Sequence, residues 1–194
     1  RTLTKKDYSD LKKSMTEAYQ GIGDVWTKEN IVDLIDAFPE GQICVEANGH
    51  VVACALSLII NSKKTNIYKS YYEIIDDGKF SKHDYEGDTL YGIEVFVHPD
   101  FRSLRLGRRL YDARKELCEQ MNLKCIIAGG RIPNYFNYAD EMSPRVYIEK
   151  VKRKEIYDPT LTFQLSNDFH VKKILKNYLP EDTESGQFAT HLEW

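Results

Sequence analysis

The stretch from Leu90 to Leu110, LYGIEVFVHPDFRSLRLGRRL, constrains the fold of this chain more than any other segment. Residues 90–97 are mostly apolar, which predicts a strand that ends at His98-Pro99-Asp100. From residue 106 to residue 121 apolar side chains return every three or four positions, which predicts an amphipathic helix. A strand that leads through a short loop into a helix indicates a layered α/β or α+β fold.

The rest of the chain alternates in the same way. Asn48-Gly49 lies between two apolar runs and predicts a two-residue hairpin turn, because such a turn needs positive φ angles. Gly129-Gly130 is expected to break the strand that begins at Cys125. Residues 171–179 fit a helix by the spacing of their apolar positions alone. The other expected elements are helices over 11–19, 27–38, 68–75 and 159–167, an insertion over 131–156 with a helix from Ser143-Pro144, and a strand over 188–194.

Composition excludes several classes of protein. A length of 194 residues suits one domain, and the net charge of −3 argues against a protein that coats nucleic acid. The longest apolar run, Val51 to Ile60, is about half of the roughly 20 residues that a membrane-spanning helix needs. The four cysteines form no CxxC pair and no His lies at ligand spacing from them, so we expect reduced cysteines, no metal site and a cytoplasmic protein.

Basic residues gather where the predicted helix begins. Residues 102–115 contain six arginines or lysines and one acid, Asp112. Positive charge at a helix N-terminus opposes the helix dipole, whereas backbone N–H groups and arginines together suit a phosphate. The pattern therefore predicts an anion site, with a solvated basic helix face as the alternative.

This passage resembles the central motif of the GCN5-related N-acetyltransferases (GNAT). The match consists of Val97-His98-Pro99-Asp100-Phe101-Arg102 followed by Leu106-Gly107, with Arg105 in place of the first motif glycine. Further matches are Phe38-Pro-Glu-Gly-Gln42 and Asn167-Asp168-Phe169. The resemblance covers most of the chain.

Three other passages resemble a narrower group, the N-terminal acetyltransferase domain of two-domain proteins that carry a carbon–nitrogen (nitrilase-like) hydrolase domain. They are residues 127–133, the arm that follows them, and residues 177–182. The resemblance implies that residues 1–194 are one acetyltransferase-like domain with an arm inserted at about 131–156. It also implies a covalently linked hydrolase domain downstream, and a strand rather than a helix over 171–179.

The resemblance further implies a mixed, mostly antiparallel central sheet that is splayed at the cofactor site and carries helices on both faces. The cofactor would be acetyl-CoA, the acyl donor. It would contact the strand backbone at Val95, Phe96 and Val97. Its pyrophosphate would meet the turn and the first helical residues, namely Arg102, Ser103, Leu104, Arg105, Leu106, Gly107, Arg108 and Arg109.

Acetyl transfer to an amine needs a group that takes a proton, because a free lysine-like amine is protonated near neutral pH. Glu94 is the candidate base, and Tyr91 is a weaker alternative; Glu94 could also simply point outward from a half-exposed strand. The position where the family often has a tyrosine acid is Gln164, which cannot supply a proton. Tyr157, Tyr178, Tyr135 and Tyr138 are left as candidates for the acid.

Two functions follow as hypotheses. The first is an acetyl-CoA-dependent N-acetyltransferase that acts on a primary amine of a small molecule or on a lysine side chain. The second is a non-catalytic acyl-CoA-binding module that regulates the adjacent hydrolase domain. The arm at 131–156 could cap the acceptor site, dock the hydrolase domain, or form a solvated helical insertion.

Overall fold

The computed structural model describes residues 1–19 and 25–194, which form two compact units. Unit 1 contains residues 1–65 and 75–126, and unit 2 contains residues 66–74 and 127–194. Each unit is described below by itself.

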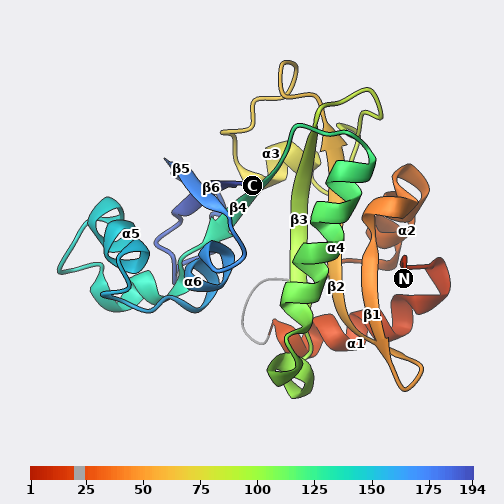
Figure 1. Cartoon of the computed structure of the whole chain (residues 1–194), viewed down its shortest axis with the longest axis horizontal. Coiled ribbons are helices and arrows are strands. Elements are labelled where there is room, and N and C mark those ends of the chain that lie inside the picture. Colours follow the sequence, from red (N-terminus) through yellow and green to blue (C-terminus); the bar gives the residue numbers. More distant parts are fainter. Residues whose placement is uncertain (20–24) are drawn as a thin grey trace. The chain divides into compact units, whose positions relative to one another are not determined.

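Unit 1 is built on a three-stranded antiparallel sheet (Figure 1). Its strands are β1 (Ile43–Ala47), β2 (His50–Ile60) and β3 (Thr89–Val97), and β2 lies between the other two. The described part of its helices comprises α1 (Tyr8–Ala18), α2 (Lys28–Ala37), α4 (Leu106–Gln120), the end of α3 (Tyr71–Ile75), and the 3₁₀ turns Lys5–Asp7, Pro39–Gly41 and Pro99–Leu104.

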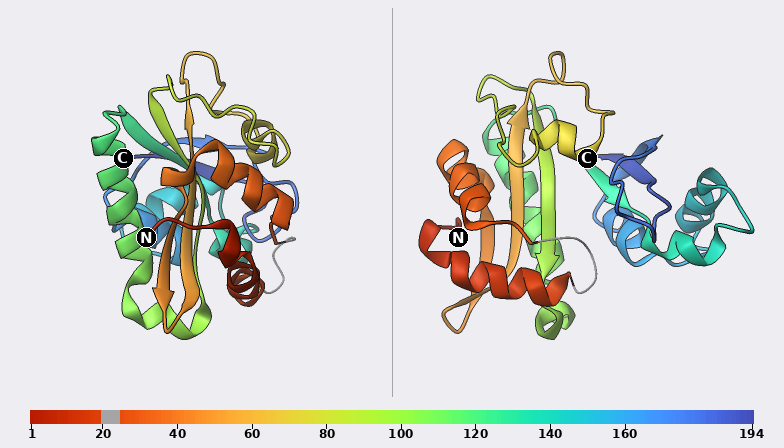
Figure 2. Two further views of the ribbon diagram at one scale, coloured as in Figure 1. Left: turned by 90° about the vertical axis from the view of Figure 1, so that its right-hand side faces the viewer. Right: turned by 180° about the vertical axis from the view of Figure 1, so that it is seen from behind.

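Helices cover both faces of this sheet. Figure 2 shows α4 on one face of the strands and α1 with α2 on the other. On the α4 side, Leu106 and Leu110 pack into a buried cluster with Ala53 and Ala55 of β2. On the α1 side, Ser14 donates a hydrogen bond of 2.6 Å to the carbonyl of Val51. The strand β2 is therefore almost wholly buried, which explains its continuous apolar run.

Unit 2 contains three strands that pair antiparallel. Its strands are β4 (Cys125–Arg131), β5 (His170–Leu175) and β6 (Ala189–Glu193), with β6 between the other two. The remaining elements are α5 (Pro144–Lys152), α6 (Pro159–Leu165) and the 3₁₀ turn Pro133–Tyr138. Strand β4 begins in unit 1, where the N–H of Lys124 donates to the carbonyl of Asp88 at 2.8 Å.

The predicted mixed α/β class with antiparallel strand pairs and helices on two faces is confirmed, and several local predictions are confirmed with it. Asn48 and Gly49 both have positive φ, 52° and 80°, as the hairpin turn requires. Thr27, Ser143 and Asp158 each cap the helix that follows them. The splay of the sheet at the cofactor site stays a prediction.

Residues 170–175 form strand β5, as the resemblance implied and against the helical spacing. One expectation about unit 2 is wrong. Gly129 and Gly130 do not break β4 but lie inside it. A Cβ atom at Gly129 would lie 2.0 Å from the ring of Tyr178, and one at Gly130 would lie 2.4 Å from the side-chain oxygen of Gln164. The glycines are there because neighbouring side chains pack directly on the strand.

The arm is packed rather than solvated. Tyr147, Ile148 and Val151 of α5 are buried. The hydroxyl of Tyr147 donates to Asp158 at 2.7 Å, and the carboxylate of Asp158 also accepts from the N–H of Asn134 at 3.1 Å. Because Asp158 caps α6, this one carboxylate ties the arm to the helix that follows it.

Neither a membrane span nor a metal site is found in the described part of the chain. None of its helices is both long and apolar enough to cross a membrane. Nor does any group of three or more His, Cys, Asp or Glu side chains there have the arrangement that holds a metal ion. All four cysteines are free thiols.

Candidate functional site

The first turn of α4 is the candidate anion site. Arg105 precedes the helix in the left-handed conformation, with a φ of 57°, and its side chain makes no capping hydrogen bond in the described structure. The first turn of α4 carries no acidic residue. Its backbone N–H groups therefore have no side-chain acceptor at the positive end of the helix dipole, which is the arrangement that binds phosphate groups.

The arginines of this turn are exposed. Arg102, Arg105, Arg108 and Arg109 all lie at the surface. Arg102 donates a 3.5 Å hydrogen bond to the carbonyl of Ala18, at the end of α1. The six basic residues predicted from the sequence do not all belong to this surface, however, because Arg114 is only 1% exposed. Arg114, one of the six basic residues counted over 102–115, is therefore not part of a surface anion site.

Other predicted cofactor-binding residues fall into three groups by exposure. Ser103 and Leu104 are exposed, with Leu104 at 56%, and Gly107 is half-buried. Leu106 is buried in the core cluster beneath the turn, so its side chain has a packing role. In β3, Phe96 is buried and contacts the ring of Tyr19, with centroids 5.8 Å apart, while Val95 and Val97 pack against the α4 side of the sheet.

Strand β3 contains a β-bulge beside Glu94. Leu56 of β2 pairs with Glu94 and the next residue, Ser57, pairs with Gly92, so Ile93 is an extra residue in β3. A bulge of this kind leaves backbone groups outside the ladder and redirects side chains. The bulge therefore sets where the side chain of Glu94 points.

Glu94 is half-buried, and its side chain interacts with Tyr19 and Trp26. Burial raises its pKa, and hydrogen bonds from Tyr19 and Trp26, together with the charge of Arg114, offset only part of that effect. A carboxylate whose pKa is raised toward neutral pH is a better general base than an exposed one. The structure thus makes Glu94 half-buried. Its hydrogen-bond partners Tyr19 and Trp26 were missed by the sequence analysis, since nothing in the local sequence connects them with β3.

Tyr91 is also buried, with 2% of its surface exposed, and lies opposite Leu58 in the register of the two strands. It lies on the N-terminal side of the bulge, and Glu94 lies on the C-terminal side, toward the turn that leads into α4. This placement favours Glu94 as the base.

The four tyrosines considered as the acid differ in their surroundings. Tyr157 is 67% exposed, and the hydroxyl of Tyr135 donates to the carbonyl of Met142 within the arm at 3.0 Å. Tyr138 is half-buried and packs against the ring of Tyr147. Tyr178 is buried and lies directly on Gly129 of β4. Of these four tyrosines, Tyr178 packs directly against strand β4.

Gln164 is buried beside the same strand of unit 2. Its side-chain oxygen lies over Gly130 and has no hydrogen-bond partner among the described residues. A buried acceptor without a hydrogen-bond partner costs free energy of folding. The amide of Gln164 has no acidic proton, so it cannot act as the general acid.

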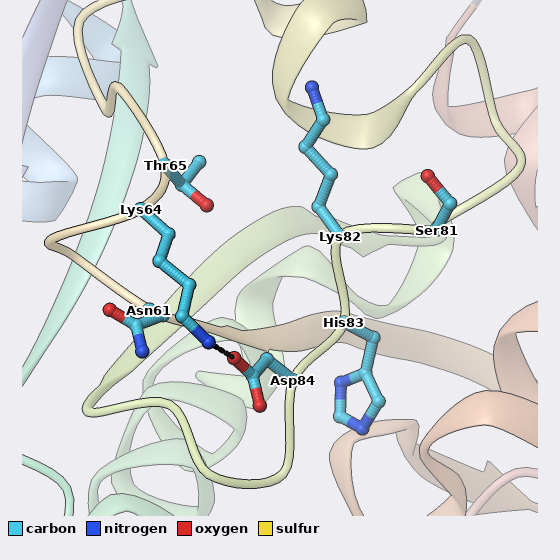
Figure 3. Close-up of a pocket in the computed structure, with 7 residues that line it drawn as sticks. All are labelled: Asn61, Lys64, Thr65, Ser81, Lys82, His83 and Asp84. Carbon is cyan, nitrogen blue, oxygen red and sulfur yellow. Dashed lines mark hydrogen bonds and ion pairs between the residues drawn. The ribbon is translucent and has the colours of Figure 1, made fainter.

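A separate pocket of about 240 Å³ lies in unit 1, beyond the end of β2 (Figure 3). Its lining is polar, and Lys64 forms an ion pair of 3.4 Å with Asp84 across it. None of the residues predicted to bind the cofactor or to act in catalysis lines this pocket.

If the exposed arginines of the α4 turn contact phosphates, the dissociation constant for CoA should rise severalfold as salt is added. Attraction between exposed charges is screened over about 10 Å at 0.1 M ionic strength. Dephospho-CoA, which lacks one phosphate, should bind more weakly and show a shallower salt dependence. Calorimetric titrations at several KCl concentrations measure both effects. A dissociation constant that does not change with salt would show that these arginines are merely a solvated face.

Comparisons with known proteins agree with this geometry. A sequence model of the "Acetyltransferase (GNAT) family" matches residues 8–138. The "Uncharacterized N-acetyltransferase YkwB" of Bacillus subtilis is 32% identical over 170 residues, which are 88% of this chain and 75% of that protein. The "Probable hydrolase YhcX" of the same organism is 43% identical over 194 residues, all of this chain. The chain spans only 38% of the length of YhcX.

Solved structures show the same fold. The loading GNATL domain of CurA from Lyngbya majuscula matches with a TM-score of 0.86 and 22% identity, over 100% of this chain and 95% of that one. The GNAT-like decarboxylase GphF, in complex with isobutyryl-CoA, matches with a TM-score of 0.83 and 17% identity, over 100% of this chain and 96% of that one.

Proposed function

Because the chain belongs to the GNAT acetyltransferase family, we propose that it is an acetyl-CoA-dependent N-acetyltransferase that acts on a primary amine of a small molecule or on a lysine side chain. One observation carries the proposal. Within unit 1, a strand with a bulge beside the half-buried Glu94 leads directly into a helix whose first turn is basic and lacks a side-chain cap. The proposed proton acceptor and the proposed phosphate site would thus be two successive parts of one strand–turn–helix.

Acetyl-CoA, the proposed acyl donor, carries phosphates that suit the first turn of α4. The first turn of α4 provides N–H groups without side-chain acceptors, and the exposed side chains of Arg105, Arg108 and Arg109 provide positive charge. Acetyl-CoA supplies an activated thioester. The N–H groups of the α4 turn would hold its pyrophosphate, and the backbone of β3 at Val95 would donate to the thioester oxygen.

Glu94 would take the proton of the acceptor amine, directly or through a water molecule. Its raised pKa suits this role, because a base works best when its pKa lies near the working pH. The thiol of CoA must also gain a proton, which the amide of Gln164 cannot donate.

The second candidate function is a non-catalytic acyl-CoA-binding module that regulates a linked hydrolase domain. Two observations favour it. Gln164 occupies the position where an acid is expected, and Arg105 stands where a glycine would let the backbone approach the pyrophosphate most closely. The name and length of the relative YhcX support the linked hydrolase, and we propose that this chain is likewise followed by such a domain in a cytoplasmic protein.

The two functions separate in one experiment. The domain is mixed with acetyl-CoA and a panel of primary amines, including lysine, polyamines and a lysine-containing peptide, and free CoA is measured with a thiol reagent. We expect amine-dependent release of CoA together with an acetylated product of the matching mass. Tight binding of acetyl-CoA with no acetylated product from any amine would support the regulatory module, and absence of binding would contradict both functions.

A further inference from the structure

Arg114 is the largest side chain in the buried interior of the described chain, and the proposed chemistry so far gives it no role. It comes from the middle of α4 and reaches the sheet at the bulge. Its guanidinium donates three hydrogen bonds: from Nη2 to the carbonyl of Leu56 at 2.9 Å, from Nη2 to the carbonyl of Glu94 at 2.8 Å, and from Nε to the hydroxyl of Ser57 at 3.0 Å.

These acceptors are the residues that flank the bulge. Leu56 and Glu94 are partners in the register, and Ser57 is the next residue of β2, where the register shifts. The guanidinium therefore donates hydrogen bonds to carbonyl groups where the regular ladder of the two strands is interrupted. These bonds connect β2 with β3 at the bulge, where Ile93 is the extra residue.

All three acceptors are neutral, which is unusual for a buried cation. A buried charge is expensive unless it is well hydrogen-bonded, and replacement of such groups by apolar ones is often neutral or stabilising. Stability alone therefore gives a weak reason for an arginine here. The ring of Tyr111, 5.8 Å from the guanidinium carbon, adds a favourable but modest contact.

The carbonyl of Glu94 and the N–H of Val95 belong to the same peptide group. Arg114 holds the oxygen of this group through a hydrogen bond of 2.8 Å. A charged donor on the oxygen of an amide polarises the whole group and strengthens its N–H as a donor. Fixing the oxygen also fixes the direction of the N–H, and a preorganised donor is what stabilises charge that develops on a thioester oxygen.

We propose that Arg114 is a positioning residue for acyl transfer, which holds and polarises the Glu94–Val95 peptide group so that the Val95 N–H can bind the acyl carbonyl oxygen. This inference rests on the proposed acetyltransferase function and adds to it. Arg114 touches neither the acyl group nor the acceptor. It acts through the backbone of β3.

The test compares Arg114→Lys and Arg114→Met with the wild type. Arg153→Lys, an identical change at an exposed position of unit 2, is the matched control. Lysine keeps the charge but cannot hold two carbonyls and a hydroxyl in one plane, and methionine removes the charge while filling part of the volume. The dissociation constants for CoA and acetyl-CoA, kcat, and KM for the amine are measured for each protein. Thermal unfolding identifies variants that are not folded.

We expect Arg114→Lys to lower kcat about tenfold, since loss of an entire oxyanion donor costs about 10²–10³-fold and here the donor is only weakened. Binding of CoA should change less than about twofold. The infrared band of the ¹³C-labelled acetyl carbonyl in bound acetyl-CoA should move back toward its position in free acetyl-CoA. If Arg114 only stabilises the fold, the unfolding temperature falls while the band and kcat of the folded protein stay unchanged, and the inference is overturned.

Ser57→Ala covers the case in which both arginine variants fail to fold. It removes one of the three bonds and leaves the arginine and both carbonyls, so a shift of the band in the same direction with a smaller loss of kcat supports the proposal, and an unchanged band contradicts it. Failure of the proposed function gives a different result. The wild type would then show no acetyl transfer, or no binding of acetyl-CoA, before any variant is compared.

Discussion

Glu94→Gln should lower kcat about a hundredfold while the affinity for acetyl-CoA stays nearly unchanged, since general-base assistance is typically worth about 10²–10⁴-fold. The amide has almost the volume of the carboxylate but cannot accept a proton near neutral pH. It can still accept hydrogen bonds from Tyr19 and Trp26, the partners that hold Glu94 in place. Steady-state rates and calorimetric titration with acetyl-CoA measure the two quantities.

The pH dependence of this variant gives a second, independent result. Burial raises the pKa of Glu94, and only the ionised carboxylate acts as a base, so the wild-type rate should fall as the pH drops through this raised pKa. The glutamine variant should lack that step. The difference between the two proteins should shrink at high pH, where more of the acceptor amine is already neutral.

Glu116→Gln is the control for both results, because it removes the same charge from an exposed position of α4 in the same unit. It should leave the rate and the pH profile as they are in the wild type. A Glu94→Gln protein with wild-type rate and pH profile would remove Glu94 from the mechanism and leave Tyr91 or solvent as the proton acceptor.

Gly107→Glu should weaken acetyl-CoA binding by about a hundredfold or more. Gly107 is the second residue of α4, so the new carboxylate would compete for the N–H groups of the first turn and repel the phosphates. The fold should be maintained, because a negative charge near a helix N-terminus is favourable for the helix dipole. Calorimetry measures the affinity, and circular dichroism and thermal unfolding report on the fold.

Two variants separate charge from volume in this experiment. Gly107→Ala adds a methyl group without charge and should lose much less affinity, while Gln120→Glu adds the same charge at the other end of α4 and should bind normally. Unchanged affinity in a folded Gly107→Glu protein would show that the pyrophosphate does not lie on this turn.

The parts of the fold that depend on neighbours in sequence were predicted correctly. Thr27 caps α2 by accepting from the N–H of Asn30, three residues ahead, and Asp158 caps α6 in the same manner. The Asn48-Gly49 turn and the passage from β3 into α4 are equally local. Such signals lie within a few residues of the structure that they determine, which is why the sequence shows them.

The burial of Arg114 on α4 was not predicted from the sequence, although the spacing of the apolar residues indicates it. Arg114 lies eight residues after Leu106 and four before Cys118, and these residues share the buried face of the helix with Leu110. The spacing alone predicts Arg114 on the buried face of the helix. Because of its charge, however, Arg114 was counted among the basic residues of the predicted anion site. A residue type that is nearly always exposed can be recognised as buried only when the carbonyls that it bonds are known.

Residues 170–175 show the reverse case. Val171, Ile174 and Leu175 have helical spacing, yet the segment pairs with β6 as strand β5. The pairing with β6, which is nearly 20 residues away in the chain, outweighs a periodicity that only a few apolar residues support. Gly129 and Gly130 lie within β4 for a comparable reason, since Tyr178 and Gln164 pack on them from distant positions.

The sequence by itself determined the family, the α/β class, the caps and turns, and the position of the basic turn at the start of α4. Only the tertiary structure decided where the bulge in β3 lies, that Arg114 holds the carbonyls beside it, and that the half-buried Glu94 meets Tyr19 and Trp26. The physical reason is the range of the interactions. Caps and turns are made between near neighbours, whereas burial of a charge and the pKa of a carboxylate depend on groups that meet only when distant segments pack together.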